Sequence, residues 1–175
     1  HKLEVTITGN KISFTSGDVK GEFDSKSARI TRYSKGSHVL NAQFPEPYFW
    51  RAPTDNDFGN KMQIRTNVWR TAGKNTSLEN IQQIEENGKQ YIVAKLKLND
   101  VASDNTIKYA LGNDGALEIQ ASYKKGNNPV PELPRFGMIF TLKNTLENLD
   151  YYGRGPLENY PDRKTSSFKG IYNSK

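Results

Sequence analysis

Apolar and polar residues alternate with a period of two along much of this 175-residue chain, and no other feature restricts its fold as strongly. Leu3, Val5 and Ile7 are separated by polar residues, which places the three apolar side chains on one face of a strand. Further short segments with apolar residues in strand-like runs follow, separated by turn residues: 12–14, 28–33, 39–40, 92–98, 107–111, 117–123 and 136–142. Many short strands between turns predict an all-β antiparallel sandwich.

Turn and helix signals complete the predicted architecture. Gly9-Asn10 and Asn87-Gly88 are dipeptides typical of tight turns between antiparallel strands. Asn60–Ala72 is the exception to the strand pattern, because its apolar residues are spaced more like those of a helix and Gly59 and Gly73 bound it. The sequence therefore predicts one short helix near 60–72. No repeat and no low-complexity linker divides the chain, so residues 1–175 are predicted to form a single domain.

Composition excludes several functions. The net charge of +6 comes from 25 Lys and Arg scattered among 19 Asp and Glu, whereas a nucleic-acid surface usually clusters its cations. No apolar run is long enough to span a membrane. The absence of Cys excludes disulfides and thiolate metal sites, and two histidines, His1 and His38, are too few for a histidine metal centre.

The first segment with candidate chemistry is Phe49–Asp57. Three acidic or amide residues follow Pro53, which favours an Asx-turn loop over a strand. Arg51, four residues before Asp55, offers a guanidinium that can bind a carboxylate through two hydrogen bonds. Asp55 and Asp57 resemble the start of a calcium loop, but the later glycine and glutamate are not at the required spacing, so an EF-hand is excluded.

The second segment is Tyr151–Lys164, where Gly153, Gly155 and Pro156 predict a rigid, irregular turn. Glu158 and Asp162 follow closely, and retaining glycoside hydrolysis needs two carboxyl groups about 5 Å apart. The alternative is that Arg154 and Arg163 pair with these acids in a structural network. We favour this alternative, because neighbouring arginines lower carboxyl pKa values and a general acid needs a raised one.

Three blocks of sequence resemble one known family: FWRAPTDNDFG at 49–59, LPRFGM at 133–138 and YGRGPLENYPDR at 152–163. They are similar in content and order to the small-chain domain, the last domain of bacterial β-galactosidases of glycoside hydrolase family 2. The resemblance extends over essentially the whole chain and implies a sandwich like that of galactose mutarotases. Because the domain is longer in that family, we expect Lys175 to lie inside it.

The resemblance implies a role without catalytic residues, cofactors or metals in this chain. In the family the catalytic glutamates and the magnesium and sodium sites belong to a TIM-barrel domain, against which the small-chain domain packs to shape the galactose pocket. The expected partners are therefore the remaining domains, a β-galactoside such as lactose, and further copies in a homo-oligomer. Localisation stays open between bacterial cytoplasm and periplasm. The candidate residues for the sugar pocket or the interdomain loops are Trp50, Arg51, Asp55, Asn56, Asp57, Arg154, Glu158, Asn159, Tyr160, Asp162 and Arg163.

Two competing functions can be weighed. Mutarotase activity needs an acid and a base on a sugar-binding face, and His38 lies outside both polar segments, which argues against it. An independent carbohydrate-binding module would use an aromatic platform, for which the chain offers Trp50, Tyr151, Tyr152 and Tyr160. We favour the interpretation that these aromatic residues are core or interface anchors.

Overall fold

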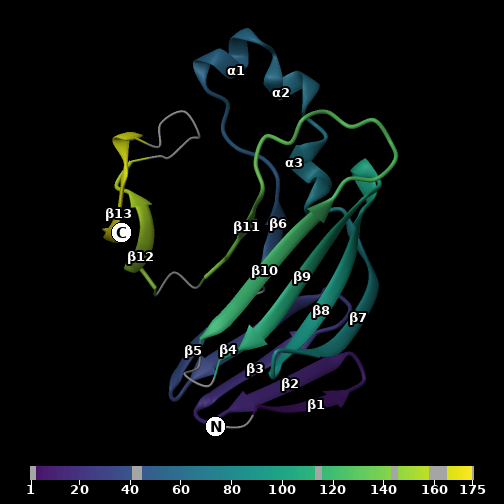
Figure 1. Cartoon of the computed structure of the whole chain (residues 1–175), viewed down its shortest axis with the longest axis vertical. Helices are drawn as coiled ribbons and strands as arrows, with labels where there is room; N and C mark the ends of the chain where they lie inside the picture. Colours follow the sequence, from purple (N-terminus) through teal and green to yellow (C-terminus); the bar gives the residue numbers. More distant parts are fainter. Residues whose placement is uncertain (1–2, 41–44, 113–115, 143–145, 158–164, 175) are drawn as a thin grey trace. The chain divides into compact units, whose positions relative to one another are not determined.

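The computed structural model describes residues 3–40, 45–112, 116–142, 146–157 and 165–174. Two compact units divide the chain, His1–Thr141 and Leu142–Lys175, and each is described by itself. In the first unit, a five-stranded antiparallel sheet is formed by β1 (Glu4–Thr8), β2 (Lys11–Ser16), β3 (Val19–Asp24), β4 (Arg29–Lys35) and β5 (His38–Leu40). Its strands lie in sequence order, so each is joined to its neighbour by a short connection (Figure 1).

A four-stranded antiparallel sheet in the order β10-β9-β8-β7 follows in the same unit. It contains β7 (Thr76–Glu86), β8 (Lys89–Leu98), β9 (Ser103–Leu111) and β10 (Leu117–Lys124), with the short 3-10 helix η1 (Asn99–Val101) between β8 and β9. Asn87 and Gly88 have φ angles of 52° and 72° in the two-residue turn between β7 and β8, as their sequence predicts. The predicted all-β antiparallel fold is thus confirmed.

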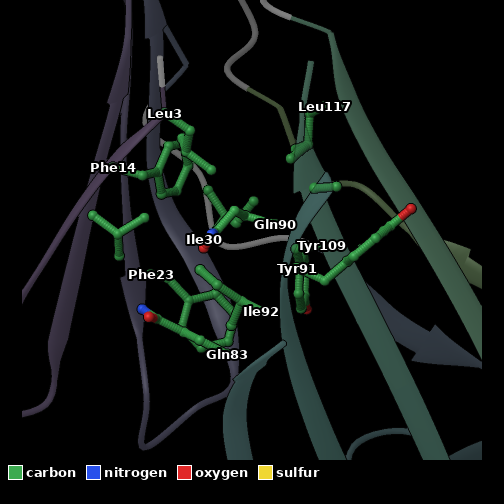
Figure 2. A pocket seen from close by; sticks show the side chains of 12 residues that line it. Leu3, Phe14, Phe23, Ile30, Gln83, Gln90, Tyr91, Ile92, Tyr109 and Leu117 are labelled. Atoms are coloured by element: carbon green, nitrogen blue, oxygen red, sulfur yellow. The ribbon is translucent and has the colours of Figure 1, made fainter. Parts of the chain in front are cut away.

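The main hydrophobic core lies between these two sheets. Alternate residues of each strand point inward, so the core draws its side chains from both sheets: Ile12, Phe14, Val19, Phe23, Ala28, Ile30, Ile92, Ala94, Leu96, Ile107 and Tyr109. Figure 2 shows several of them facing one another across the sandwich. The buried Tyr109 hydroxyl donates a hydrogen bond of 2.9 Å to the Ala28 carbonyl oxygen, which links the second sheet to the turn before β4.

A second core cluster is built on aromatic residues where α3 (Trp69–Ala72) and η1 meet the four-stranded sheet. Its buried members are Phe49, Trp50, Met62, Trp69, Ala72, Leu98 and Val101. Phe49 lies 5.7 Å from Trp69 between ring centroids, and Tyr123 lies within 6.2 Å of both rings. The indole nitrogen of Trp69 donates to the Pro131 carbonyl oxygen at 3.2 Å, which ties the irregular segment after β10 to this cluster.

The helical region differs from its prediction. It contains three short helices, α1 (Asp55–Gly59), α2 (Met62–Arg65) and α3 (Trp69–Ala72), instead of one helix over 60–72. The spacing of Met62 and Trp69 correctly places both in the core. The helix is interrupted at Lys61, whose φ of 58° is left-handed, and again after Thr66, where Asn67 and Trp69 donate their N–H groups to carbonyls three residues back.

Close backbone approach explains one glycine. A Cβ atom added to Gly73, at the end of α3, would lie 1.9 Å from the Pro47 carbonyl oxygen of β6 (Glu46–Tyr48). β6 pairs antiparallel with β11 (Gly137–Ile139). The apolar run predicted over 136–142 is therefore a strand only at its centre, and Phe136, Phe140 and Leu142 are exposed.

The second unit contains β12 (Leu149–Gly155) paired antiparallel with β13 (Phe168–Ser174). Gly153 and Gly155 lie within β12, so the prediction of an irregular turn at these glycines is wrong. The reason is steric: a Cβ atom on Gly155 would lie 2.8 Å from the Tyr151 hydroxyl and 2.9 Å from the Tyr172 ring. Gly155 makes room for these two rings, whose centroids are 5.5 Å apart. Of the described helices, none is long and apolar enough to cross a membrane.

Candidate functional site

The segment Trp50–Asp57 leads into α1 (Asp55–Gly59), whose first turn is held by a capping box. Thr54 is the N-cap of α1, and its hydroxyl oxygen accepts a hydrogen bond from the Asp57 N–H at 3.4 Å. The Asp57 carboxylate accepts in return from the Thr54 N–H at 2.8 Å. The predicted Asx-turn loop is therefore a helical turn. The pattern Thr-x-x-Asp at 54–57 is a signal that could have identified it, because it satisfies two free N–H groups at a helix start.

Arg51 binds this same carboxylate through both terminal nitrogens. Its Nη1 and Nη2 donate to Asp57 Oδ2 at 2.5 Å and Oδ1 at 2.9 Å. The predicted two-bond contact of Arg51 with a carboxylate is made with Asp57, because the first turn of α1 directs Asp57 back toward the N-cap and leaves Asp55 exposed. Asp57 is 6% exposed, so the carboxylate in this ion pair is buried.

The electrostatic consequence is a carboxyl group that stays ionised. The hydrogen bonds from Arg51, and then those from Thr54, hold the pKa of Asp57 well below its usual range, although burial opposes this shift. A general acid needs the opposite shift, toward neutral pH. Asp57 therefore stabilises the turn, and we call its ion pair with Arg51 the Arg51–Asp57 brace.

The remaining candidates of this segment divide into buried and exposed side chains. Trp50 is buried in the second core cluster, and the Arg70 guanidinium lies 5.3 Å from the centroid of its ring. Sequence reasoning did not identify Arg70, which carries no local signal for this contact. Asp55 and Asn56 are exposed on α1, and so are the apolar side chains Phe58 and Ile64 of α1 and α2.

A contact that the sequence did not predict ties α2 to the segment after β10. Arg65 donates through Nε to Glu132 Oε1 at 2.9 Å, and through Nη1 to the Asn60 carbonyl oxygen at 2.7 Å. Glu132 directly precedes the LPRFGM block. Phe136 of that block stacks on Phe49 of the first, with 6.1 Å between ring centroids.

Of the candidates in the second segment, only Arg154 lies among the residues that the structure describes. Arg154 lies on β12 and donates through Nη1 to the Ser167 carbonyl oxygen at 2.9 Å. Glu158, Asn159, Tyr160, Asp162 and Arg163 lie outside the described residues. The hypothesis of a carboxylate pair at Glu158 and Asp162, and that of its neutralisation by Arg154 and Arg163, both stay predictions.

Two cavities in the described part of the first unit are lined by none of the candidates in Trp50–Asp57. The gap in Figure 2 has a volume of about 20 Å³, which suits one water molecule and is far below the size of a ligand pocket. A second, mostly apolar cavity of about 270 Å³ opens beside Ile7, Ile12 and Ile81. In the described ranges, no group of three or more Asp, Glu or His side chains is arranged to hold a metal ion.

The fold and the site define an all-β domain with a braced helical turn, and the comparisons with known proteins give its family. A family model described as beta galactosidase small chain matches residues 15–175. The chain therefore belongs to the β-galactosidase small-chain family.

Relatives named beta-galactosidase match nearly the whole chain. The protein of Priestia megaterium is 34% identical over 94% of this chain, that of Clostridium acetobutylicum 32% over 99%, and that of Lactobacillus delbrueckii subsp. bulgaricus 34% over 95%. The chain spans only 15%, 19% and 16% of the length of these three proteins. It corresponds to one part of a much longer polypeptide in each of them.

Proposed function

We propose that this chain is the non-catalytic small-chain domain of a β-galactosidase that hydrolyses terminal β-D-galactosides such as lactose. In this proposal it packs on a catalytic barrel domain and helps to shape the mouth of the sugar pocket. The family match and the names of the relatives support the enzyme class. The Arg51–Asp57 brace is the structural observation that carries the non-catalytic role.

Retaining hydrolysis needs one carboxyl group that can give up a proton near neutral pH and a second that attacks the sugar. Asp57 is unsuited to the acid role because its pKa is lowered. It is unsuited to attack on a sugar because it is buried and both of its oxygens accept hydrogen bonds from Arg51 or Thr54. A rigid turn of this kind instead presents its outer side chains, Asp55 and Asn56, in a defined position. These two side chains are our candidates for contact with the sugar pocket or with the neighbouring domain.

The intact enzyme that carries this domain provides the test. Arg51→Ala should lower thermal stability or domain docking more than it changes the chemical step, whereas Asp55→Ala should raise KM for a chromogenic galactoside with little change in kcat. An Arg51→Ala enzyme that folds and docks normally but loses kcat about tenfold or more would contradict the role of the brace.

The chain itself should show no turnover of the same galactoside, because we expect the catalytic glutamates and the magnesium and sodium sites in other domains. Turnover that disappears in Glu158→Gln would place catalysis in this chain and overturn the proposal. The competing function, an independent carbohydrate-binding module, is tested by titrating the chain with galactose or lactose and following NMR shifts. Saturable binding at millimolar or lower sugar concentration would support that module.

A further inference from the structure

Two hairpin turns of the first unit pair an asparagine with a glycine, and they do so in opposite order. Gly9-Asn10 joins β1 to β2, and Asn87-Gly88 joins β7 to β8 (Figure 1). Both asparagines are exposed. The order matters chemically, because the side-chain carbonyl carbon of an asparagine is attacked by the backbone nitrogen of the residue that follows it. The two asparagines therefore differ in the nitrogen that each one meets.

The nitrogen that follows Asn87 is accessible for this reaction. It belongs to Gly88, which has no side chain to hinder the approach, and a Cβ atom built on Gly88 would meet no atom within 4 Å apart from its chain neighbours. The β7–β8 ladder ends at the pair Glu86–Lys89, so both residues of the turn lie outside it. The reaction requires the turn to change its conformation, and the end of a hairpin can open locally while the rest of the unit stays folded.

The nitrogen that follows Asn10 is better protected. It belongs to Lys11, whose Cβ atom hinders the approach to the Asn10 side chain. Lys11 is also paired with Thr8 in the β1–β2 ladder, so its nitrogen must leave this strand pair before it can react. The same two residue types are thus exposed to the reaction in one order and protected from it in the other.

We propose that Asn87 is a site of spontaneous deamidation, in which Gly88 supplies the nucleophile and water is the only other reactant. The backbone nitrogen of Gly88 forms a bond to the side-chain carbonyl carbon of Asn87, and the bond from that carbon to Nδ2 breaks. Nδ2 takes the proton of the attacking nitrogen and leaves as ammonia. Water then opens the cyclic imide at either of its carbonyl groups, which gives aspartate or isoaspartate without any oxidation or reduction. The inference is independent of the proposed enzyme activity.

The two products change the end of the hairpin in different ways. Both add a negative charge next to Glu85 and Glu86. Isoaspartate also routes the main chain through its side-chain carbon, which adds one backbone atom to a two-residue turn and shifts Glu86 relative to Lys89. Glu86 also forms an ion pair of 2.9 Å with Lys108 of β9, so this shift reaches the neighbouring strand. Isoaspartate at position 87 should therefore loosen this end of the four-stranded sheet.

Ageing of the 175-residue chain in mildly alkaline buffer, followed by peptide mapping with mass spectrometry, tests the proposal. Deamidation should accumulate at Asn87 about tenfold or more faster than at Asn10 in the same sample. A synthetic peptide of residues 84–91, aged beside the chain, shows how fast the same sequence reacts without the fold. A chain whose Asn87 is still intact when this peptide is fully converted, or one whose Asn10 reacts as fast as Asn87, would overturn the proposal.

The variant Asn87→Asp separates the added charge from the added backbone atom. Freshly prepared, it carries the charge of the products on an unchanged backbone, and it should unfold close to the Tm of the native chain, because Asp-Gly also suits a two-residue hairpin turn. The isoaspartate fraction of the aged chain, isolated by ion-exchange chromatography, should unfold about 2–4 °C or more below this variant. Equal Tm values would show that the turn accommodates isoaspartate and would refute the loosening of the sheet.

Discussion

Asp57→Asn should destabilise the first unit by about 2–3 kcal/mol. The two carboxylate oxygens accept hydrogen bonds from both terminal nitrogens of Arg51 and from the N–H and hydroxyl groups of Thr54. An Asn side chain would turn an N–H₂ group toward these donors and leave the guanidinium without its counter-charge. Breaking a buried ion pair from one side costs about 3–5 kcal/mol. We expect less here because the Arg51 side chain is 23% exposed, so water partly solvates it.

Thermal unfolding followed by tryptophan fluorescence measures this effect, because both tryptophans of the chain, Trp50 and Trp69, lie in the second core cluster. For a protein of this size, 1 kcal/mol shifts Tm by about 2–4 °C, so the expected loss of Tm is roughly 4–12 °C. Asp55→Asn is the matched control, since it removes an exposed carboxylate two residues away, and should change stability by less than about 0.5 kcal/mol.

The Tm difference between the native chain and Asp57→Asn should also depend on pH in a defined direction. The pKa of Asp57 is lowered in the folded chain, so its contribution is complete above the unfolded value of about 3.9 and is lost as the pH falls below that value. The difference in Tm between the native chain and Asp57→Asn should be constant from about pH 5 to 8 and shrink toward pH 3. Equal Tm values at neutral pH, or a difference that grows on acidification, would refute the reasoning.

Two other substitutions test the packing. Tyr109→Phe removes the hydroxyl that donates to the Ala28 carbonyl oxygen and should cost about 1–2 kcal/mol in urea unfolding, and an unchanged midpoint would show that water or backbone relaxation replaces this bond. Gly73→Ala would bring a methyl group to within 1.9 Å of the Pro47 carbonyl oxygen and should cost more than about 2 kcal/mol, whereas Gly59→Ala, with open space around it, should be nearly neutral. Equal stability of the two alanine variants would mean that α3 can move away from β6 without cost.

The strands were predictable because their signal is local. Alternation in segments such as 92–98 and 117–123 predicts one buried face, and the structure places both segments in the four-stranded sheet. The two-residue turn at Asn87-Gly88 was predictable for the same reason, since both residues readily adopt positive φ. The buried residues of the expected helix were predicted correctly, but the helix is broken by the left-handed Lys61 and by hydrogen bonds to carbonyls three residues back after Thr66.

The sequence was enough to predict which residues make up the candidate site, but not which of them contact one another. The segment around Arg51 stands out by composition. The partner of Arg51 is Asp57, because the first turn of α1 directs the Asp57 carboxylate back toward the N-cap. The glycines of β12 suggest a turn by composition, whereas both lie in the strand and Gly155 accommodates the Tyr151 and Tyr172 rings. That contact depends on the pairing with β13. A local pattern cannot contain such information about a distant strand.

The sequence by itself determined the class of fold, the family and the two polar segments, since the period of apolar residues and short blocks of identity are properties of neighbouring residues. Only the tertiary structure decided that Trp50 is buried in an aromatic cluster and that Glu132 binds Arg65. It also decided that Tyr152 and Ile171 lie opposite each other on neighbouring strands with both side chains exposed. The physical reason is that burial and pairing depend on which segments pack together. That choice is made by the whole chain when it removes its apolar surface from water.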